Sequence, residues 1–477
     1  MKKEKDTMQR SLRDRHIQMI ALGCAIGTGL FYGSASAIQL AGPAIMLSYL
    51  IGGVFIYLVV RALGEMSVHN PVSGSFSTYA YEYWGDFPGF LSGWNYWFNY
   101  VAISMAEVTV VGLYMHFCFP DLPTWVSGLV LVIIVNAINL TNVKAFGEVE
   151  FWGALVKVAA ISLMIFFGCL MIFFGFGVGE PIGLGNIINH GGFMPNGVYG
   201  MLLSFVVVTF AFGGTELIGI TAGEAENPEH TIPKAIKLII LRILIFYVGA
   251  MFVLVTLYPW DQVGAAGSPF VEIFMELGIS SAAVILNVIV LTAVFSAYNS
   301  CLYSNARMLH ALALQGNAPA FFGKLSTNGV PRRAVLFSSC FVIVVVALMT
   351  VMPDQMFMYV MSIATVAALI NWIMILITQM KFRKAIGFKK EMSLTFKMPW
   401  YPYSNIVAII YFALIGAVMT TMADFQIAIF LAPFWVLLIY IGYRLKRKTP
   451  TLPVSPGATK PEWALFSLER NSFGMGN

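Results

Sequence analysis

The sequence predicts an all-α protein that crosses a membrane twelve times, and its composition and the spacing of its charges lead to that fold class. Of the 477 residues, 58% are hydrophobic and 11% are charged, whereas a soluble domain carries about a quarter charged residues. So few charges cannot cover a water-soluble fold of this length. We expect a lipid bilayer around the chain. We do not expect nucleic acid as a partner, because the net charge of +5 comes from basic residues in the tails and in the loops between spans and so bears on membrane topology.

Charge-free runs locate the spans, since a helix that crosses about 30 Å of hydrocarbon needs about 20 apolar residues. Residues 17–60 carry no charge and are long enough for two spans that divide near Ala41-Gly42-Pro43. Two of the later runs are each interrupted by one charge, Glu107 and Lys157. The other ten spans are expected in 87–120, 122–143, 151–179, 181–215, 243–260, 277–306, 334–353, 355–380, 398–423 and 425–443.

One membrane domain, 17–446, is expected between an N-terminal tail, 1–16, and a C-terminal tail, 447–477. Its expected parts are a first five-helix repeat, a second repeat and two further helices, at about 17–179, 193–380 and 398–446.

The basic residues predict how the chain is oriented in the membrane. Lys and Arg cluster before span one and after the even-numbered spans, and only Lys157 lies within a span. The loops on the other side carry acids instead, at Asp121, Glu180, Asp261, Asp354 and Asp424. By the positive-inside rule, both termini are therefore predicted to be cytoplasmic.

Several classes of function are disfavoured. The five cysteines and six histidines stand singly along the chain, which argues against a disulfide framework or a metal site, and no cofactor is expected. The chain has neither a nucleotide-binding Walker sequence nor clustered catalytic side chains, so a primary pump and a membrane enzyme fit poorly. A channel would need a ring of charges or carbonyls, usually repeated between subunits. A secondary transporter is favoured.

Two spans contain clusters of glycine, which costs about 1 kcal/mol in a helix interior. Span one reads Gly23-Cys24-Ala25-Ile26-Gly27-Thr28-Gly29, and span six reads Phe210-Ala211-Phe212-Gly213-Gly214-Thr215-Glu216. Close helix packing would explain either cluster alone. Because the clusters fall in corresponding spans of two five-helix halves, we interpret them as paired helix breaks that form a transporter site. Unpaired N–H groups would bind the carboxylate of an amino acid, and unpaired carbonyls would bind its amino group.

Three ionisable residues lie within or beside the spans, where charge is costly and usually functional. Lys157 would either serve the site or extend its long side chain toward the cytoplasm. Glu107 is too deep and too short to reach water, so its alternative role is a satisfied structural hydrogen bond. Glu216 would either belong to the site or brace the break in span six.

Ordered motifs along most of the chain carry a family resemblance. They are Arg15-His16-Ile17, Gly27-Thr28-Gly29-Leu30-Phe31, Arg61-Ala62-Leu63-Gly64-Glu65-Met66, Gly147-Glu148-Val149-Glu150-Phe151-Trp152, Gly219-Ile220-Thr221-Ala222-Gly223-Glu224 and Asn305-Ala306-Arg307-Met308-Leu309. With these motifs the chain resembles bacterial amino-acid permeases of the amino acid–polyamine–organocation superfamily. The resemblance implies a leucine-transporter-like fold of two inverted five-helix repeats with helices one and six broken, followed by two more helices.

The resemblance also implies a substrate site. The substrate carboxylate would meet the backbone N–H groups of Thr28 and Gly29, with Gly29 in a non-helical conformation. The amine would meet the carbonyls of Ile26, Phe210 and Ala211, and the ring of Phe210 would close the pocket. Gly213 is predicted to belong to the same site. The residues predicted to break or gate the helices are Gly23, Gly27, Phe212, Gly214, Glu216 and Ser296.

Proton coupling is implied in the same way. Lys157 matches a lysine that takes the place of a sodium ion in proton-coupled relatives, where it would face the carbonyls of Gly23 and Ile26 and a hydroxyl such as that of Ser296. Glu107 matches an acid in the pocket of several such relatives. Burial favours the uncharged form of both groups, so both are expected to exchange protons. Sodium is not expected to be required, because one fixed cation repels another.

The motifs that bear on the substrate are mixed. Those resembling aromatic amino-acid permeases are Val72-Ser73-Gly74-Ser75-Phe76, Gly93-Trp94-Asn95-Tyr96-Trp97, Met105-Ala106-Glu107 and Gln315-Gly316-Asn317-Ala318-Pro319. Those resembling the proline and histidine branch are Gly29-Leu30-Phe31-Tyr32-Gly33-Ser34 and His69-Asn70-Pro71. We therefore predict a proton-coupled importer of a neutral L-amino acid in the bacterial inner membrane, with phenylalanine, tyrosine or tryptophan preferred. The alternative is a proline, histidine or γ-aminobutyrate permease, and a channel or an exchanger is less favoured.

Overall fold

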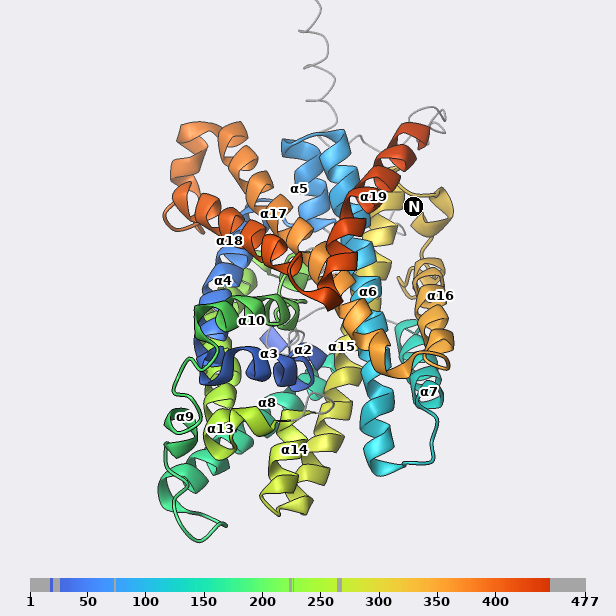
Figure 1. Cartoon of the computed structure of the whole chain (residues 1–477). Helices are drawn as coiled ribbons and strands as arrows, with labels where there is room; N and C mark the ends of the chain where they lie inside the picture. Colours follow the sequence, from blue (N-terminus) through green and yellow to red (C-terminus); the bar gives the residue numbers. More distant parts are fainter. Residues whose placement is uncertain are drawn as a thin grey trace, which may run out of the picture.

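The computed structural model describes residues 18–19, 26–72, 74–141, 143–222, 225, 227–263 and 268–446. Within these ranges the chain folds into helices joined by turns, with no strand (Figure 1). Both predicted tails, Gly23, and the motif residues Arg15-His16-Ile17 and Gly223-Glu224 lie outside the described residues. The helices are α2 (Thr28–Phe31), α3 (Gly33–Ala41), η1 (Gly42–Ala44), α4 (Ile45–His69), α5 (Ser75–Tyr83), α6 (Asp86–Cys118), α7 (Thr124–Asn139), α8 (Val143–Phe174), α9 (Gly185–Ile188), α10 (Gly197–Ala211), α11 (Leu217–Thr221), α12 (Pro228–Arg242), η3 (Ile243–Gly249), α13 (Ala250–Leu257), η4 (Trp260–Gln262), α14 (Pro269–Glu276), α15 (Ser280–Leu314), η5 (Ala320–Gly323), α16 (Arg332–Leu348), α17 (Pro353–Ser393), α18 (Tyr403–Met419) and α19 (Ala423–Lys446).

Most of the predicted spans appear as long apolar helices. Within the described ranges, seven helical segments are long and apolar enough to cross a membrane: Gly33–His69, Asp86–His116, Phe146–Phe174, Pro228–Leu257, Ser280–Leu314, Gln355–Gly387 and Ala423–Lys446. Shorter apolar helices follow at Thr124–Asn139, Gly197–Ala211 and Tyr403–Met419. Large apolar side chains such as Ile133, Phe166 and Phe434 are exposed, as lipid-facing side chains are. The chain is an all-helical protein that crosses the membrane several times, and the count of twelve stays a prediction.

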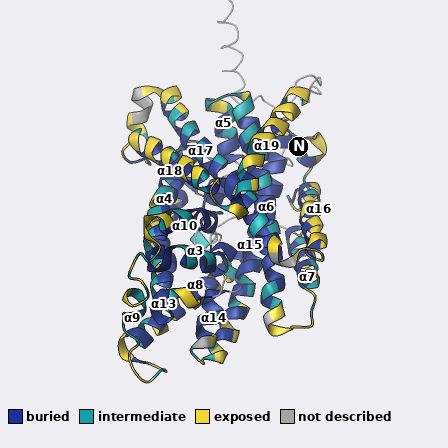
Figure 2. Cartoon of the chain, in the orientation of Figure 1, coloured by how far each residue is buried: buried dark blue, intermediate teal, exposed yellow. Residues whose placement is uncertain are grey.

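The interior is built around α6. This helix packs most extensively against α15 and α17, and the short helix α2 contacts α3, α6, α10 and α15. Figure 2 shows buried residues along α6 and α15 in the middle of the molecule and exposed residues on α16, α18 and α19. The position of α2 beside these long buried helices brings the first predicted helix break into the centre of the protein.

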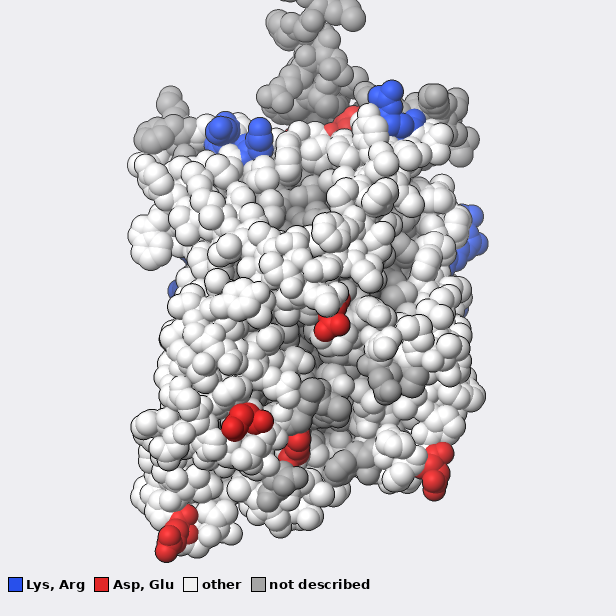
Figure 3. Space-filling view, viewed as in Figure 1, with Lys and Arg blue, Asp and Glu red and all other residues white. Residues whose placement is uncertain are grey.

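On the face that Figure 3 shows, charges are unevenly distributed along the long axis of the molecule. In Figure 3 the visible Lys and Arg side chains lie in the upper half, whereas most of the visible Asp and Glu side chains lie in the middle and lower parts. This is the separation from which the positive-inside rule predicts a cytoplasmic location for the basic end, and the orientation itself stays a prediction.

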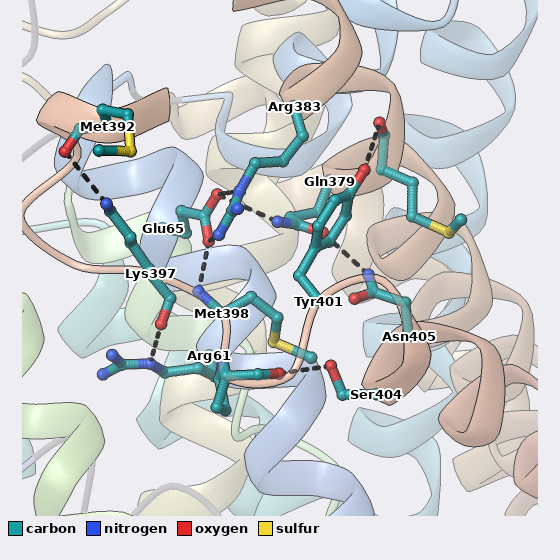
Figure 4. Close-up of polar contacts among 12 residues, drawn as sticks. Arg61, Glu65, Gln379, Arg383, Met392, Lys397, Met398, Tyr401, Ser404 and Asn405 are labelled. Atoms are coloured by element: carbon teal, nitrogen blue, oxygen red, sulfur yellow. Dashed lines mark hydrogen bonds and ion pairs between the residues drawn. The ribbon is translucent and has the colours of Figure 1, made fainter. Parts of the chain in front are cut away.

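A buried ion pair joins α4 to α17 at the basic end (Figure 4). Arg383 on α17 donates to both carboxylate oxygens of Glu65 on α4, at 2.5 and 2.8 Å. Gln379 Nε2 and the backbone N–H of Met398 also donate to this carboxylate, at 3.0 and 2.5 Å. Because four donors satisfy one buried carboxylate, the charge is tolerated and the register between α4 and α17 is fixed.

The motif from Arg61 to Met66 is explained by this contact. Arg61 lies one helical turn before Glu65, donates to the carbonyl of Lys397 at 2.8 Å and stacks on the ring of Phe396, 3.4 Å from its centroid. A Cβ at Gly64 would lie 2.2 Å from Ile236 Cδ1, so glycine allows α12 to pack closely against α4. The motif therefore holds three helices together at the basic end.

Candidate functional site

The first predicted helix break lies where α2 begins. Gly27 has an extended backbone, with φ −132° and ψ −156°, and the helix starts at Thr28. It ends at Phe31, after which Tyr32 separates it from α3. The first turn of a helix leaves backbone N–H groups without partners inside the helix. Thr28 and Gly29, which we predicted to bind a carboxylate, occupy this turn.

The second predicted break lies between α10 and α11. The helix α10 ends at Ala211, the chain turns through 212–216, and α11 begins at Leu217. Gly214 has a φ of +95°, which favours glycine over residues with a side chain. Two carbonyls at this break already accept hydrogen bonds. The Phe210 carbonyl accepts from the backbone N–H of Gly213 at 2.9 Å. The Ala211 carbonyl accepts from the Tyr247 hydroxyl at 3.2 Å. A carbonyl has two lone pairs, so each keeps capacity for one more donor.

The two breaks meet at a cavity of about 20 Å³, which is enough for about one water molecule and too small for an amino acid. Seven of its lining residues were predicted to belong to the site: Gly27, Gly29, Glu107, Phe210, Ala211, Gly213 and Gly214. The other three, Ile103, Ala297 and Cys301, were not predicted. Because the cavity is smaller than an amino acid, a substrate can bind there only if the surrounding helices move apart.

Glu107 holds the beginning of α2. Its Oε1 accepts hydrogen bonds from the backbone N–H of Thr28 at 3.3 Å and from the Thr28 hydroxyl at 2.8 Å. Its Oε2 has no hydrogen-bond partner among the described residues. A Cβ at Gly27 would lie 2.8 Å from Oε1, so this glycine makes room for the carboxylate. A carboxylate of the protein thus occupies part of the position that we predicted for the substrate carboxylate.

Gly29 differs from the expectation in its conformation. It lies within the helical turn of α2 rather than in a non-helical conformation. Glycine is needed there for another reason, because a Cβ would lie 2.4 Å from the Cα of Ala211. The requirement is therefore for a close approach between α2 and the end of α10, not for an unusual backbone angle.

Lys157 is fully buried on α8, so it does not extend to water. Its Nζ donates to the hydroxyl of Ser296 on α15 at 3.0 Å, the contact that the resemblance implied. Its predicted contact with Gly23 concerns a residue outside the described ranges, and its predicted contact with the carbonyl of Ile26 stays a prediction.

Glu216 and Phe212 brace the second break instead of lining the cavity. Glu216 is buried, and its Oε2 accepts from Trp372 Nε1 at 3.3 Å and from the Thr215 hydroxyl at 3.4 Å. The ring of Phe212 packs edge-on against Tyr49, with centroids 5.9 Å apart. These contacts fit the alternative that we gave for Glu216, which is a structural role at the turn.

A larger chamber of about 510 Å³ lies beyond the cavity, and its lining includes Tyr32, Gln39, Phe357 and Asp424. The ring of Phe357 contacts that of Tyr32 at 4.7 Å and that of Phe210 at 6.1 Å between centroids. Since Phe210 lines the small cavity and the other two rings line the chamber, these three rings form an aromatic layer between the two spaces.

Sequence reasoning missed Glu150, Tyr247 and Trp372. Glu150 is fully buried and accepts from the Ser296 hydroxyl at 2.7 Å, so it joins the contact of Lys157. Its spacing of seven residues from Lys157, which places both on one helical face, was a signal that could have revealed it. The partners of Tyr247 and Trp372 come from distant segments and left no such local signal.

Comparison with known proteins identifies the relatives of this chain. The family model for amino acid permeases matches residues 16–455. The aromatic amino acid transport protein AroP of Escherichia coli (strain K12) is 48% identical over 446 residues, which cover 93% of this chain and 97% of that protein. AroP of Salmonella typhimurium (strain LT2) is 47% identical with the same coverage. A Bacillus subtilis (strain 168) protein named as the amino acid permease YtnA is 47% identical over 444 residues, or 93% of this chain and 96% of that protein.

Permeases move amino acids across a membrane without changing them chemically, so the chain is a transporter and not an enzyme. The long apolar helices, the paired helix breaks and a family match over nearly the whole length point to one assignment. The chain belongs to the amino acid permease family.

Proposed function

We propose that this permease imports a neutral L-amino acid, preferably phenylalanine, tyrosine or tryptophan, together with protons. The aromatic preference is supported by the relatives named AroP, which are 47–48% identical to it over 93% of its length. The coupling is supported by one observation above all, which is that the Glu107 carboxylate accepts hydrogen bonds from Thr28 at the start of α2.

The proposed architecture is a single domain of twelve spans, 17–446, with inverted repeats at about 17–179 and 193–380 and two further helices at about 398–446. The breaks at α2 and between α10 and α11 support the pairing of the repeats, because they fall at corresponding positions of the two halves. We place the protein in the bacterial inner membrane with both termini in the cytoplasm, on the positive-inside rule.

The substrate would bind between the two breaks. Its carboxylate would accept from the N–H groups of Thr28 and Gly29, and its amino group would donate to the carbonyls of Ile26, Phe210 and Ala211. Because the cavity holds about 20 Å³, an aromatic side chain needs the layer of Tyr32, Phe210 and Phe357 to open. Closure of that layer behind the substrate would then separate the site from the larger chamber.

Coupling follows from competition for Thr28. Two carboxylates at one buried position repel each other unless one of them carries a proton. Protonation of Glu107 removes its charge, weakens its hold on Thr28 and allows the substrate carboxylate to bind. The free Oε2 of Glu107 is where that proton would bind. Lys157, held by Ser296, would occupy the position of a coupling cation and so make sodium unnecessary.

Glu107→Gln tests this coupling. Glutamine keeps an oxygen that accepts from Thr28 but takes up no proton, so uptake should become nearly independent of external pH. In the unmodified protein, uptake should rise as external pH falls. Initial rates of labelled L-phenylalanine uptake across a pH series would measure the difference. Glu229→Gln, at an exposed position on α12, should keep the normal dependence. An unchanged pH profile in Glu107→Gln would remove Glu107 from the coupling.

The function itself is tested in sodium-free proteoliposomes with the outside more acidic than the inside. Labelled L-phenylalanine should accumulate above its external concentration, and tyrosine and tryptophan should compete more strongly than the other amino acids in a panel of all twenty. Uptake of proline or histidine without competition by phenylalanine would favour the alternative substrate. Accumulation that appears only after sodium is added would contradict proton coupling.

A further inference from the structure

Glu150 is a buried carboxyl group that the proposed function does not yet use. It is fully buried on α8, and its Oε1 accepts from the Ser296 hydroxyl at 2.7 Å. The same hydroxyl accepts from Lys157 Nζ at 3.0 Å. The Oε2 of Glu150 has no hydrogen-bond partner among the described residues. A buried carboxylate with one satisfied oxygen is costly unless it has a function or a counter-charge.

The local geometry of α8 and α15 builds this contact. Residues 150, 153 and 157 lie on one face of α8, since they are three and seven residues apart. A Cβ at Gly153 would lie 3.1 Å from both Cβ and Oγ of Ser296, so glycine lets α15 approach between the two charged residues. Ser296 therefore sits between Glu150 and Lys157 and is hydrogen-bonded to both.

No other charged side chain competes for Glu150 in the described helices that pack most against α8. Those helices are α7, α13, α15 and η3, and only α15 carries charged or imidazole groups, Arg307 and His310. Arg307 lies 3.3 Å from the ring centroid of Tyr303, and His310 Nδ1 lies 3.2 Å from the carbonyl of Phe322. The group that the geometry connects to Glu150 is Lys157, through Ser296.

We infer that Glu150 accepts the proton that Lys157 releases, with Ser296 as the relay between them. The inference rests on the proposed proton coupling. A proton leaves Lys157 Nζ and bonds to Ser296 Oγ, while the Ser296 hydroxyl proton leaves and bonds to Glu150 Oε1. The products are a neutral amine, an unchanged hydroxyl and a neutral carboxylic acid, with no change in total charge and no redox step. In the structure Lys157 already donates to Ser296, and Ser296 already donates to Glu150, so both donors face the acceptors that the transfer requires.

The relay also has a direction along the membrane. Glu150 lies seven residues closer than Lys157 to the start of α8 at Val143, or about 10 Å along the helix axis. The start of α8 is predicted to be cytoplasmic. A proton that passes from Lys157 to Glu150 therefore moves toward the side on which an importer releases it, and Lys157 becomes neutral at the same step.

Glu150→Gln and Ser296→Ala test the relay in the full-length protein, reconstituted without sodium. The probe is labelled L-phenylalanine or the amino acid that displaces it in the panel. We expect both variants to exchange amino acid between equal internal and external pools. Their accumulation driven by a proton gradient should fall about a hundredfold, as expected when a positioned proton-transfer group is lost. Glu148→Gln, a half-buried acid on the same helix, should keep normal accumulation.

The outcomes separate the relay from the proposed coupling. If the unmodified protein does not accumulate substrate on a proton gradient, the proposed coupling fails and the relay fails with it. If it does, and Glu150→Gln accumulates equally well, the relay alone is overturned. Should Glu150→Gln fail to fold, Ser296→Ala gives the same decision, because it interrupts the relay and leaves both charged groups in place. A purely structural role for Glu150 would lower exchange and accumulation together.

Discussion

Gly29→Ala is expected to lower amino-acid uptake about a hundredfold, which is the effect of displacing site groups by about 1 Å. The added Cβ would lie 2.4 Å from the Cα of Ala211 and 3.0 Å from its backbone nitrogen. Backbone atoms cannot rotate away as a flexible side chain can, so α2 and the end of α10 must separate. The N–H groups of α2 are proposed to bind the substrate carboxylate, and the carbonyls at the end of α10 are proposed to bind its amino group. The movement would separate these two sets of groups.

Gly33→Ala is the matched control for this prediction. Gly33 lies four residues further along the chain, at the start of α3. Its added Cβ would lie 3.5 Å from Val207 Cγ1, which is an ordinary contact. Uptake by this variant should stay close to normal. Binding of labelled L-phenylalanine to purified protein, measured alongside thermal unfolding, separates a damaged site from a damaged fold. A folded Gly29→Ala protein with normal affinity would exclude the approach of α2 to α10 as part of the site.

Lys157→Met should abolish accumulation of amino acid on a proton gradient while leaving some exchange of internal for external substrate. Methionine nearly matches lysine in length but has no ionisable group, so Glu150 loses the cation to which Ser296 connects it. A buried carboxylate that loses its counter-charge destabilises the fold, so the unfolding temperature should fall as well. Accumulation and exchange are measured in the same proteoliposomes.

The control for this variant is Lys237→Met on α12, where the side chain is exposed. The chemical change is the same, and accumulation should be normal because no buried group depends on Lys237. If Lys157→Met continued to accumulate substrate, a lysine at this position would not be the coupling cation. Addition of sodium offers a further check, because a site vacated by the ammonium could admit a small cation and partly restore transport.

The sequence by itself determined the class of this protein and the place of its helix breaks. Hydropathy and glycine content are local properties, so the charge-free runs predicted long apolar helices, and the structure has helices at these positions. The glycine cluster from Gly213 to Gly214 predicted a break, and α10 indeed ends at Ala211. Family resemblance added the contact between Lys157 and Ser296, which a single sequence could not have supplied from its own pattern.

Only the tertiary structure decided which groups face one another across the helices. Thr28 and Glu107 are 79 residues apart, and Glu150 and Ser296 are 146 apart. No periodicity within either helix encodes such pairs, because they depend on the rotation and depth of two helices packed together. The same is true of Gly29, whose need for glycine comes from the approach of Ala211 rather than from its own backbone. Local patterns predict elements, whereas packing decides the partners of buried polar groups, since each of these must be satisfied where the helices meet.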